Sequence, residues 1–127
     1  MKLVSLFRIT ASVIIAQIAL GGLVTFGFID PLVHMLWGFF VTVVAMVTGF
    51  VTLRSRPTDR GLRGVSAGLI VAILAQVALG FTTLALASNF LAWVHLVLGV
   101  LVYAMAITGM GFAQRQEYMS LKGTGLG

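Results

Sequence analysis

Two six-residue stretches, Ala16–Gly21 (AQIALG) and Ala75–Gly80 (AQVALG), differ at one position, and each is followed by one of the chain's two histidines, His34 and His95. The match continues beyond the histidines at a spacing of four, three and four residues. The residues at this spacing are His34, Gly38, Val41 and Ala45 in the first copy and His95, Gly99, Val102 and Ala106 in the second. Because this spacing follows one face of an α-helix, the repeat predicts two helical hairpins of the same kind.

The composition places these hairpins in a membrane. Of the 127 residues, 60% are hydrophobic and 9% are charged, whereas a soluble domain is about one quarter charged. Four apolar stretches, none of which alternates in polarity, are each close to the ~20 residues that a helix needs to span a bilayer. They cover roughly Leu6–Phe28, Leu32–Leu53, Val65–Ala87 and Phe90–Phe112. We therefore expect one domain over residues 1–127, an all-α bundle of four transmembrane helices.

The basic residues predict the orientation of this bundle. All eight lie before or at the start of the first stretch, between the second and third, or after the fourth. The positive-inside rule then places both termini and the middle loop in the cytoplasm, in a multi-pass protein of the cell membrane. This distribution explains the net charge of +5 without nucleic-acid binding. Lys2 ahead of an apolar run resembles a signal peptide, but the run is too long and lacks a small-residue cleavage site, so we expect a retained helix.

The histidine pair indicates a cofactor site. Two copies of one hairpin have the same orientation, so a pseudo-two-fold axis along the membrane normal sets His34 and His95 face to face at one depth. Pro31 suits the first turn of its helix, so His34 lies close to the helix start. His95 lies similarly close to the start of the fourth stretch, and both histidines are therefore expected near the outer boundary. Two opposed imidazoles fit the two axial positions of a haem iron. Cofactor sites of this kind are often built in the cores of helix bundles. The alternatives to haem are a hydrogen-bonded histidine pair and another metal. A zinc or copper site would require more ligands than two histidines, and the chain has no cysteine to supply them.

Further residues near this pair are candidates for the cofactor pocket. Gly38 and Gly99 lie one turn from the histidines, where a larger side chain would strike a porphyrin ring, although such glycines also serve close helix packing. The other candidates are Gly21 and Gly80, which could make room for the ring edges, Gln17 and Gln76, the aromatic residues Phe28, Trp37, Phe81 and Trp93, and the hydroxyl of Thr25. The glutamines could equally join helices by hydrogen bonds, and the tryptophans could be interfacial anchors.

The stretch Gln17–Thr25 (QIALGGLVT), followed by a histidine at the outer end of the next helix, resembles half of a haem A synthase, and so does Gln76–Gly80 followed by Trp93–Gly99 (WVHLVLG). Members of that family have two similar four-helix halves, each with a histidine pair. One pair binds haem b, and the other holds haem O, whose methyl group is oxidised to a formyl group to give haem A. The resemblance implies that His34 and His95 are axial ligands to iron and that a half-length chain forms a homodimer with one haem per bundle.

This chain departs from the family pattern at the catalytic positions. The family's catalytic half usually has a glutamate three residues before its histidine and an arginine after it, where this chain has Pro31 and Met35. Thr25 stands where an arginine is common, and Asp30 is the nearest carboxylate, a weak candidate for the missing catalytic acid. Three functions follow as hypotheses. They are a haem A synthase-like oxidoreductase, a b-type cytochrome between a quinol and an outer-face acceptor, and a non-catalytic helical subunit of a respiratory complex.

Overall fold

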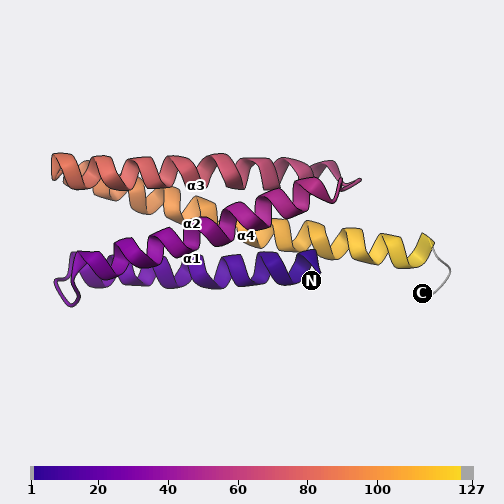
Figure 1. Cartoon of the computed structure of the whole chain (residues 1–127), viewed down its shortest axis with the longest axis horizontal. Helices are drawn as coiled ribbons and strands as arrows, with labels where there is room; N and C mark the ends of the chain where they lie inside the picture. The colour runs from indigo at the N-terminus through magenta and orange to yellow at the C-terminus, as the bar shows by residue number, and fades with distance from the viewer. Residues whose placement is uncertain (1, 124–127) are drawn as a thin grey trace.

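Four antiparallel helices form one elongated bundle in a computed structural model that describes residues 2–123 (Figure 1). Helices α1 and α3 each pack against both α2 and α4, so α2 and α4 lie diagonally opposite each other. The helices are α1 (Leu3–Thr25), α2 (Pro31–Arg54), α3 (Arg60–Leu86) and α4 (Asn89–Gly123). The prediction of an all-helical, four-helix bundle is confirmed.

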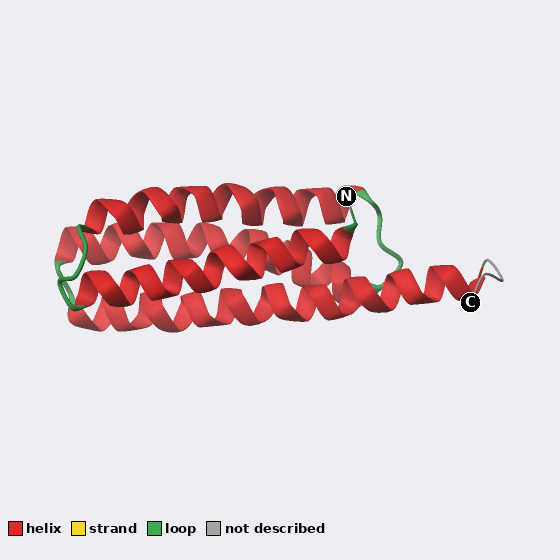
Figure 2. Cartoon of the chain, turned by 90° about the horizontal axis from the view of Figure 1, so that it is seen from below, coloured by secondary structure: helices red, strands yellow, loops and turns green. Residues whose placement is uncertain are grey.

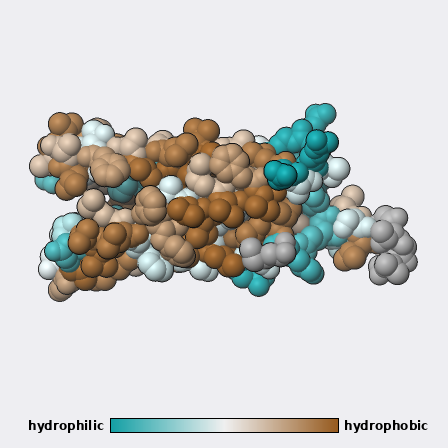
Figure 3. Space-filling model, in the orientation of Figure 1, coloured by the Kyte–Doolittle hydropathy of each residue, from teal (hydrophilic) through white to brown (hydrophobic). Residues whose placement is uncertain are grey.

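The outer surface of the bundle suits a lipid environment. All four helices are long and apolar enough to cross a membrane, and large apolar side chains such as Phe39 and Val71 are 73% and 68% exposed. Figure 3 shows mainly hydrophobic residues along the bundle and hydrophilic residues gathered at one end, with only a few at the other. Because soluble monomers rarely expose contiguous apolar surface on this scale, the chain is a multi-pass membrane protein.

Short connections and polar caps fix where the helices begin. The side chain of Asp30 accepts a hydrogen bond from the backbone N–H of Leu32 at 2.7 Å, and Pro31 occupies the first position of α2, as the sequence predicts. Asp59 accepts a bond from the backbone N–H of Leu62 at the start of α3. Both caps satisfy amide groups that a helix start leaves unpaired.

The predicted helix ends differ most from the structure at two places, while α1 starts and ends about three residues earlier than predicted. Helix α3 begins at Arg60 instead of near residue 65, and α4 runs to Gly123 instead of ending near residue 112. Figure 2 shows α4 projecting beyond the bundle. The prediction followed apolar content, but polar residues such as Gln114 and Arg115 also favour helix, so this helix continues past its apolar part.

One half of the bundle is tightly packed. Phe7, Leu62 and Leu69 are fully buried there, at the end that carries the middle loop. A hydrogen bond of 2.8 Å between the hydroxyls of Thr10 and Thr48 joins α1 to α2 within this core. In the other half, which contains both histidines, no residue from 15 to 40 or from 74 to 98 is buried. The core therefore holds the helices together at one end and leaves the histidine end more open.

Candidate histidine site

The two histidines meet across the diagonal of the bundle. His34 lies in the first turn of α2 and His95 in the second turn of α4, and their ring centroids are 6.4 Å apart with an angle of 75° between the ring planes. Helices α2 and α4 make no backbone-level contact. The imidazoles therefore approach each other across an interior space instead of across a packed helix interface.

Each imidazole is held by a glutamine from the preceding helix. The amide nitrogen of Gln17 lies 3.1 Å from Nε2 of His34 and donates to the main-chain oxygen of His34 at 3.1 Å. In the second hairpin, the amide nitrogen of Gln76 lies 3.4 Å from Nε2 of His95 and donates to the main-chain oxygen of His95 at 2.8 Å. The tautomer of each imidazole decides the role of Nε2 in these contacts, and Nδ1 of both rings has no hydrogen-bond partner.

Glycines make this arrangement possible. A Cβ atom on Gly38 would lie 2.8 Å from the amide nitrogen of Gln17, and one on Gly21 would lie 3.1 Å from Cε1 of His34. The corresponding distances in the second hairpin are 3.0 Å from Gly99 to Gln76 and 3.1 Å from Gly80 to His95. The four glycines thus leave room for glutamine and histidine side chains of the neighbouring helix. These contacts explain the glycines directly, without clearance for a porphyrin ring.

The site contains an unusual concentration of unpaired polar atoms. Five buried side-chain oxygen or nitrogen atoms in the described part of the chain have no hydrogen-bond partner. Four of them belong to the site: Nδ1 of His34, Nδ1 of His95, Oε1 of Gln17 and Oε1 of Gln76. A buried polar group without a partner costs about 1–3 kcal/mol. Such a cluster is typical of a functional site and not of a packed core.

A cavity of about 420 Å³ adjoins both histidines. Gln17, Gln76, His34 and His95 supply its polar wall, and the other walls are mostly apolar side chains of α2 and α3. These are Met35, Phe39 and Val41 of α2 and Ile73, Leu74, Val77, Phe81 and Leu84 of α3. Figure 3 shows the surface hollowed between these two helices. The cavity therefore lies beside the seam of α2 and α3.

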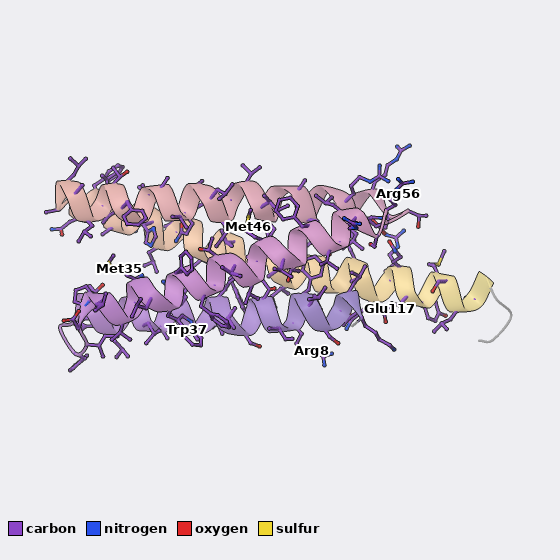
Figure 4. The ribbon with its side chains drawn as sticks, in the orientation of Figure 1. Arg8, Met35, Trp37, Met46, Arg56 and Glu117 are labelled. Carbon is purple, nitrogen blue, oxygen red and sulfur yellow. The ribbon has the colours of Figure 1, made fainter. Side chains whose placement is uncertain are left out.

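Of the other predicted site residues, Gly38, Gly80 and Phe81 also line this cavity, and the rest lie outside it. Trp37 donates from Nε1 to the main-chain oxygen of Val13 on α1, and Figure 4 shows it on the side of α2 away from Met35. Trp93 is 61% exposed and stacks on Phe90. Phe28 is largely exposed.

The predicted polar groups are used within their own helices. The hydroxyl of Thr25 donates to the main-chain oxygen of Gly21, and Asp30 is the cap of α2. Thr42 and Thr83 line the cavity, but their hydroxyls donate to carbonyls four residues earlier. Within residues 2–123, no Asp, Glu, Lys or Arg side chain lines the cavity.

Part of the cavity wall was not predicted from the sequence. Met35, Phe39 and Thr42 follow one another at intervals of four and three residues on α2. This helical stripe begins one residue after His34, so it could have been found from spacing alone. Its partners on α3 could not, because nothing local in the sequence says that α3 approaches this side of α2.

The donor set fits a metal held from two opposite sides. Metal–imidazole bonds are about 2 Å long, so two rings on opposite sides of one ion have centres roughly 6 Å apart. The observed 6.4 Å between His34 and His95 meets this condition. No group of three or more His, Cys, Asp or Glu side chains occurs in the described residues 2–123, so a zinc site with three or four protein ligands is not supported. The site suits a cofactor that brings its own equatorial ligands.

Comparisons of the chain with family models, with curated proteins and with solved structures find no match.

Proposed function

We propose that the chain is a membrane haem-binding protein in which His34 and His95 are the two axial ligands of a b-type haem. The observation that carries this proposal is the pair of imidazoles 6.4 Å apart in the wall of a largely apolar cavity. Two further features support it. Each ring is held by a glutamine of the preceding helix, Nδ1 of each ring is left without a hydrogen-bond partner, and none of the described carboxylates lines the cavity to favour a different metal.

Electron transfer is the activity that this arrangement supports best. His34 and His95 would hold the iron from both faces and leave no open coordination position for oxygen or substrate, and the haem would supply one-electron redox chemistry. Gln17 and Gln76 hold the imidazoles, while Phe39, Phe81 and Leu84 keep water from the cavity. The protein then acts as a b-type cytochrome that passes electrons between a quinol and an acceptor at the outer face.

Oxidation of haem O to haem A is the second candidate. It rests on the resemblance of Gln17–Thr25 and Trp93–Gly99 to half of a haem A synthase, and the apolar wall of α2 and α3 suits a hydrophobic macrocycle. Asp30, the nearest carboxylate, lies outside the cavity and caps α2, which favours the first candidate. In the enzymatic version a homodimer rebuilds the eight-helix arrangement of that family.

The proposed placement in the cell follows from charge. The termini and the middle loop, with all eight basic residues, face the cytoplasm, and the histidines lie near the outer face of the cell membrane. The matched contacts of Gln17 with His34 and of Gln76 with His95 support an origin of the two hairpins by duplication.

The test combines spectroscopy with haem analysis. The purified protein should show a sharp α-band on reduction, and a quinol should produce it. If the α-band appears only with dithionite and no quinol tried reduces the haem, the cytochrome version fails. Chromatography of haems from cells supplied with haem O separates the second candidate, because haem A appears only if the chain is catalytic. A colourless protein from haem-supplied cells would overturn haem binding and leave a helical subunit of a respiratory complex.

Two adjacent glycines give a sharper test of the site. Gly21→Ala places a methyl group 3.1 Å from the His34 ring, whereas a Cβ on Gly22 meets nothing within 4 Å. We expect Gly21→Ala to weaken haem binding about fivefold, since crowding a packed site costs about 1 kcal/mol or more, and Gly22→Ala to leave it unchanged. Titration of both apoproteins with haem measures this. Equal affinities would show that the His34 ring orientation does not matter for the cofactor.

A further inference from the structure

A second cavity, separate from the histidine site, lies between α1 and α4 in the tightly packed half of the bundle. Its volume is about 210 Å³. Apolar side chains and three polar ones line it: Ala11, Ile15, Ile107 and Met110, with Arg8, Ser12 and Tyr103. It lies beside the close contact of α1 with α4 at Phe7 and Gly109, so its floor is a rigid part of the molecule.

The three polar side chains of this cavity make no hydrogen bond with the described residues. Most other hydroxyl groups of the helices donate to the carbonyl four residues earlier, as those of Thr25, Thr82 and Thr108 do. Ser12 makes no such bond although Arg8 is four residues before it on the same helix. Polar groups on a membrane helix are costly without a hydrogen-bonding partner. We therefore expect Arg8, Ser12 and Tyr103 to bind a polar group from outside the chain.

The charge of the cavity indicates what that partner is. Arg8 has no acidic neighbour: within residues 2–123, the one ion pair found joins Arg115 to Asp59. Arg8 lies in the second turn of α1, about 8 Å along the helix from Leu3, where a guanidinium reaches the headgroup region of a bilayer. Basic pockets between membrane helices are recognised by anionic lipid headgroups, and guanidinium is a preferred donor to phosphate.

The apolar residues extend from this cation toward the membrane centre. Ile15 lies seven residues after Arg8 on α1, roughly 10 Å deeper, and Ile107 lines the same cavity from α4 at about the depth of Arg8, since Gly109 is level with Phe7. Both are exposed, at 48% and 39%. A cation at one end and exposed branched side chains along the groove match the headgroup and the acyl chain of a phospholipid.

We propose that this groove, defined by Arg8, Ser12, Ile15, Tyr103 and Ile107, is a binding site for an anionic phospholipid. Arg8 pairs with the phosphate, the hydroxyl of Ser12, one turn deeper on α1, donates to an ester oxygen, and one acyl chain lies along Ile15 and the ring of Tyr103. Tyr103 is deeper than Ile107, because α4 is antiparallel to α1 and its Gly109 is level with Phe7. The lipid would fill the seam of α1 and α4 and strengthen the packed half of the bundle. The proposal does not depend on the identity of the cofactor at the histidines.

Native mass spectrometry of the full chain in a mild detergent tests this proposal. The protein is titrated with phosphatidylglycerol and, separately, with phosphatidylcholine of the same acyl chains. We expect the anionic lipid to bind at least tenfold more tightly. Arg8→Gln should weaken phosphatidylglycerol binding about tenfold, as for loss of a charge-assisted hydrogen bond, and Tyr103→Phe should weaken it less.

Arg60→Gln is the matched control, because it removes the same charge from another exposed arginine at the same end. Tyr118→Phe controls for loss of a phenol. Equal affinities of wild type and Arg8→Gln, or equal losses in Arg8→Gln and Arg60→Gln, would overturn the proposal, as would displacement of the lipid by millimolar inorganic phosphate, which would indicate a simple anion site. The visible spectrum of Arg8→Gln should match that of wild type, so this result is read independently of haem binding.

Discussion

His34→Ala and His95→Ala should each reduce haem content to less than a tenth of wild type, with loss of the reduced α-band. Both histidines are needed, because the rings face each other at 6.4 Å and each supplies one axial bond that the other cannot replace. Altering groups that merely orient a metal ligand costs about 10–100-fold in affinity, and removing the ligand should cost at least as much. Pyridine haemochrome analysis of the purified variants measures the haem content.

Leu36→Ala is the control for these variants, because Leu36 lies on the same turn of α2 but is 64% exposed and does not line the cavity. Added imidazole should restore part of the α-band in His34→Ala and His95→Ala if the protein is folded and lacks only the ligand. A full α-band in either histidine variant would contradict paired ligation. Loss of helicity in both variants, with no recovery in imidazole, would show that the histidines are structural.

Gly109→Ala should destabilise the bundle by about 1–3 kcal/mol, the usual cost of overpacking a core. A Cβ at this position of α4 would collide with the ring of Phe7 on α1. Phe7 is fully buried, so its ring has no space into which it can turn. The two helices must separate to accept the methyl group, and the core around them loses contact.

Gly111→Ala provides a control of opposite sign. A Cβ there meets nothing within 4 Å, and replacing a glycine within a helix by alanine stabilises it by up to about 1 kcal/mol. Thermal unfolding of both variants in one detergent, followed by circular dichroism, should therefore show a lower midpoint for Gly109→Ala and an equal or higher one for Gly111→Ala. The same midpoint in both would show that α1 and α4 do not pack as closely as the structure indicates.

Much of the fold could be predicted because the signals for it are local. A helix forms and enters a membrane according to the apolar content of its own ~20 residues, so the four helices were found. A proline at the first position and an aspartate before it mark the start of α2 in the sequence as they do in the structure. The repeat also predicts that His34 and His95 face each other at one depth, because that conclusion needs only two copies of one hairpin.

The tertiary structure alone decided which groups surround the histidines. Contacts such as Gln17 with His34, or a Cβ of Gly38 with Gln17, join different helices, and their occurrence depends on how the helices rotate and how closely they approach. The position of the cavity beside α2 and α3, and the contrast between a packed half and an open half, depend on the same two quantities. Composition and periodicity determine that four helices cross the membrane with a histidine pair near one end. Interhelical distance and rotation, which no local pattern encodes, determine the shape and the polar lining of the site between them.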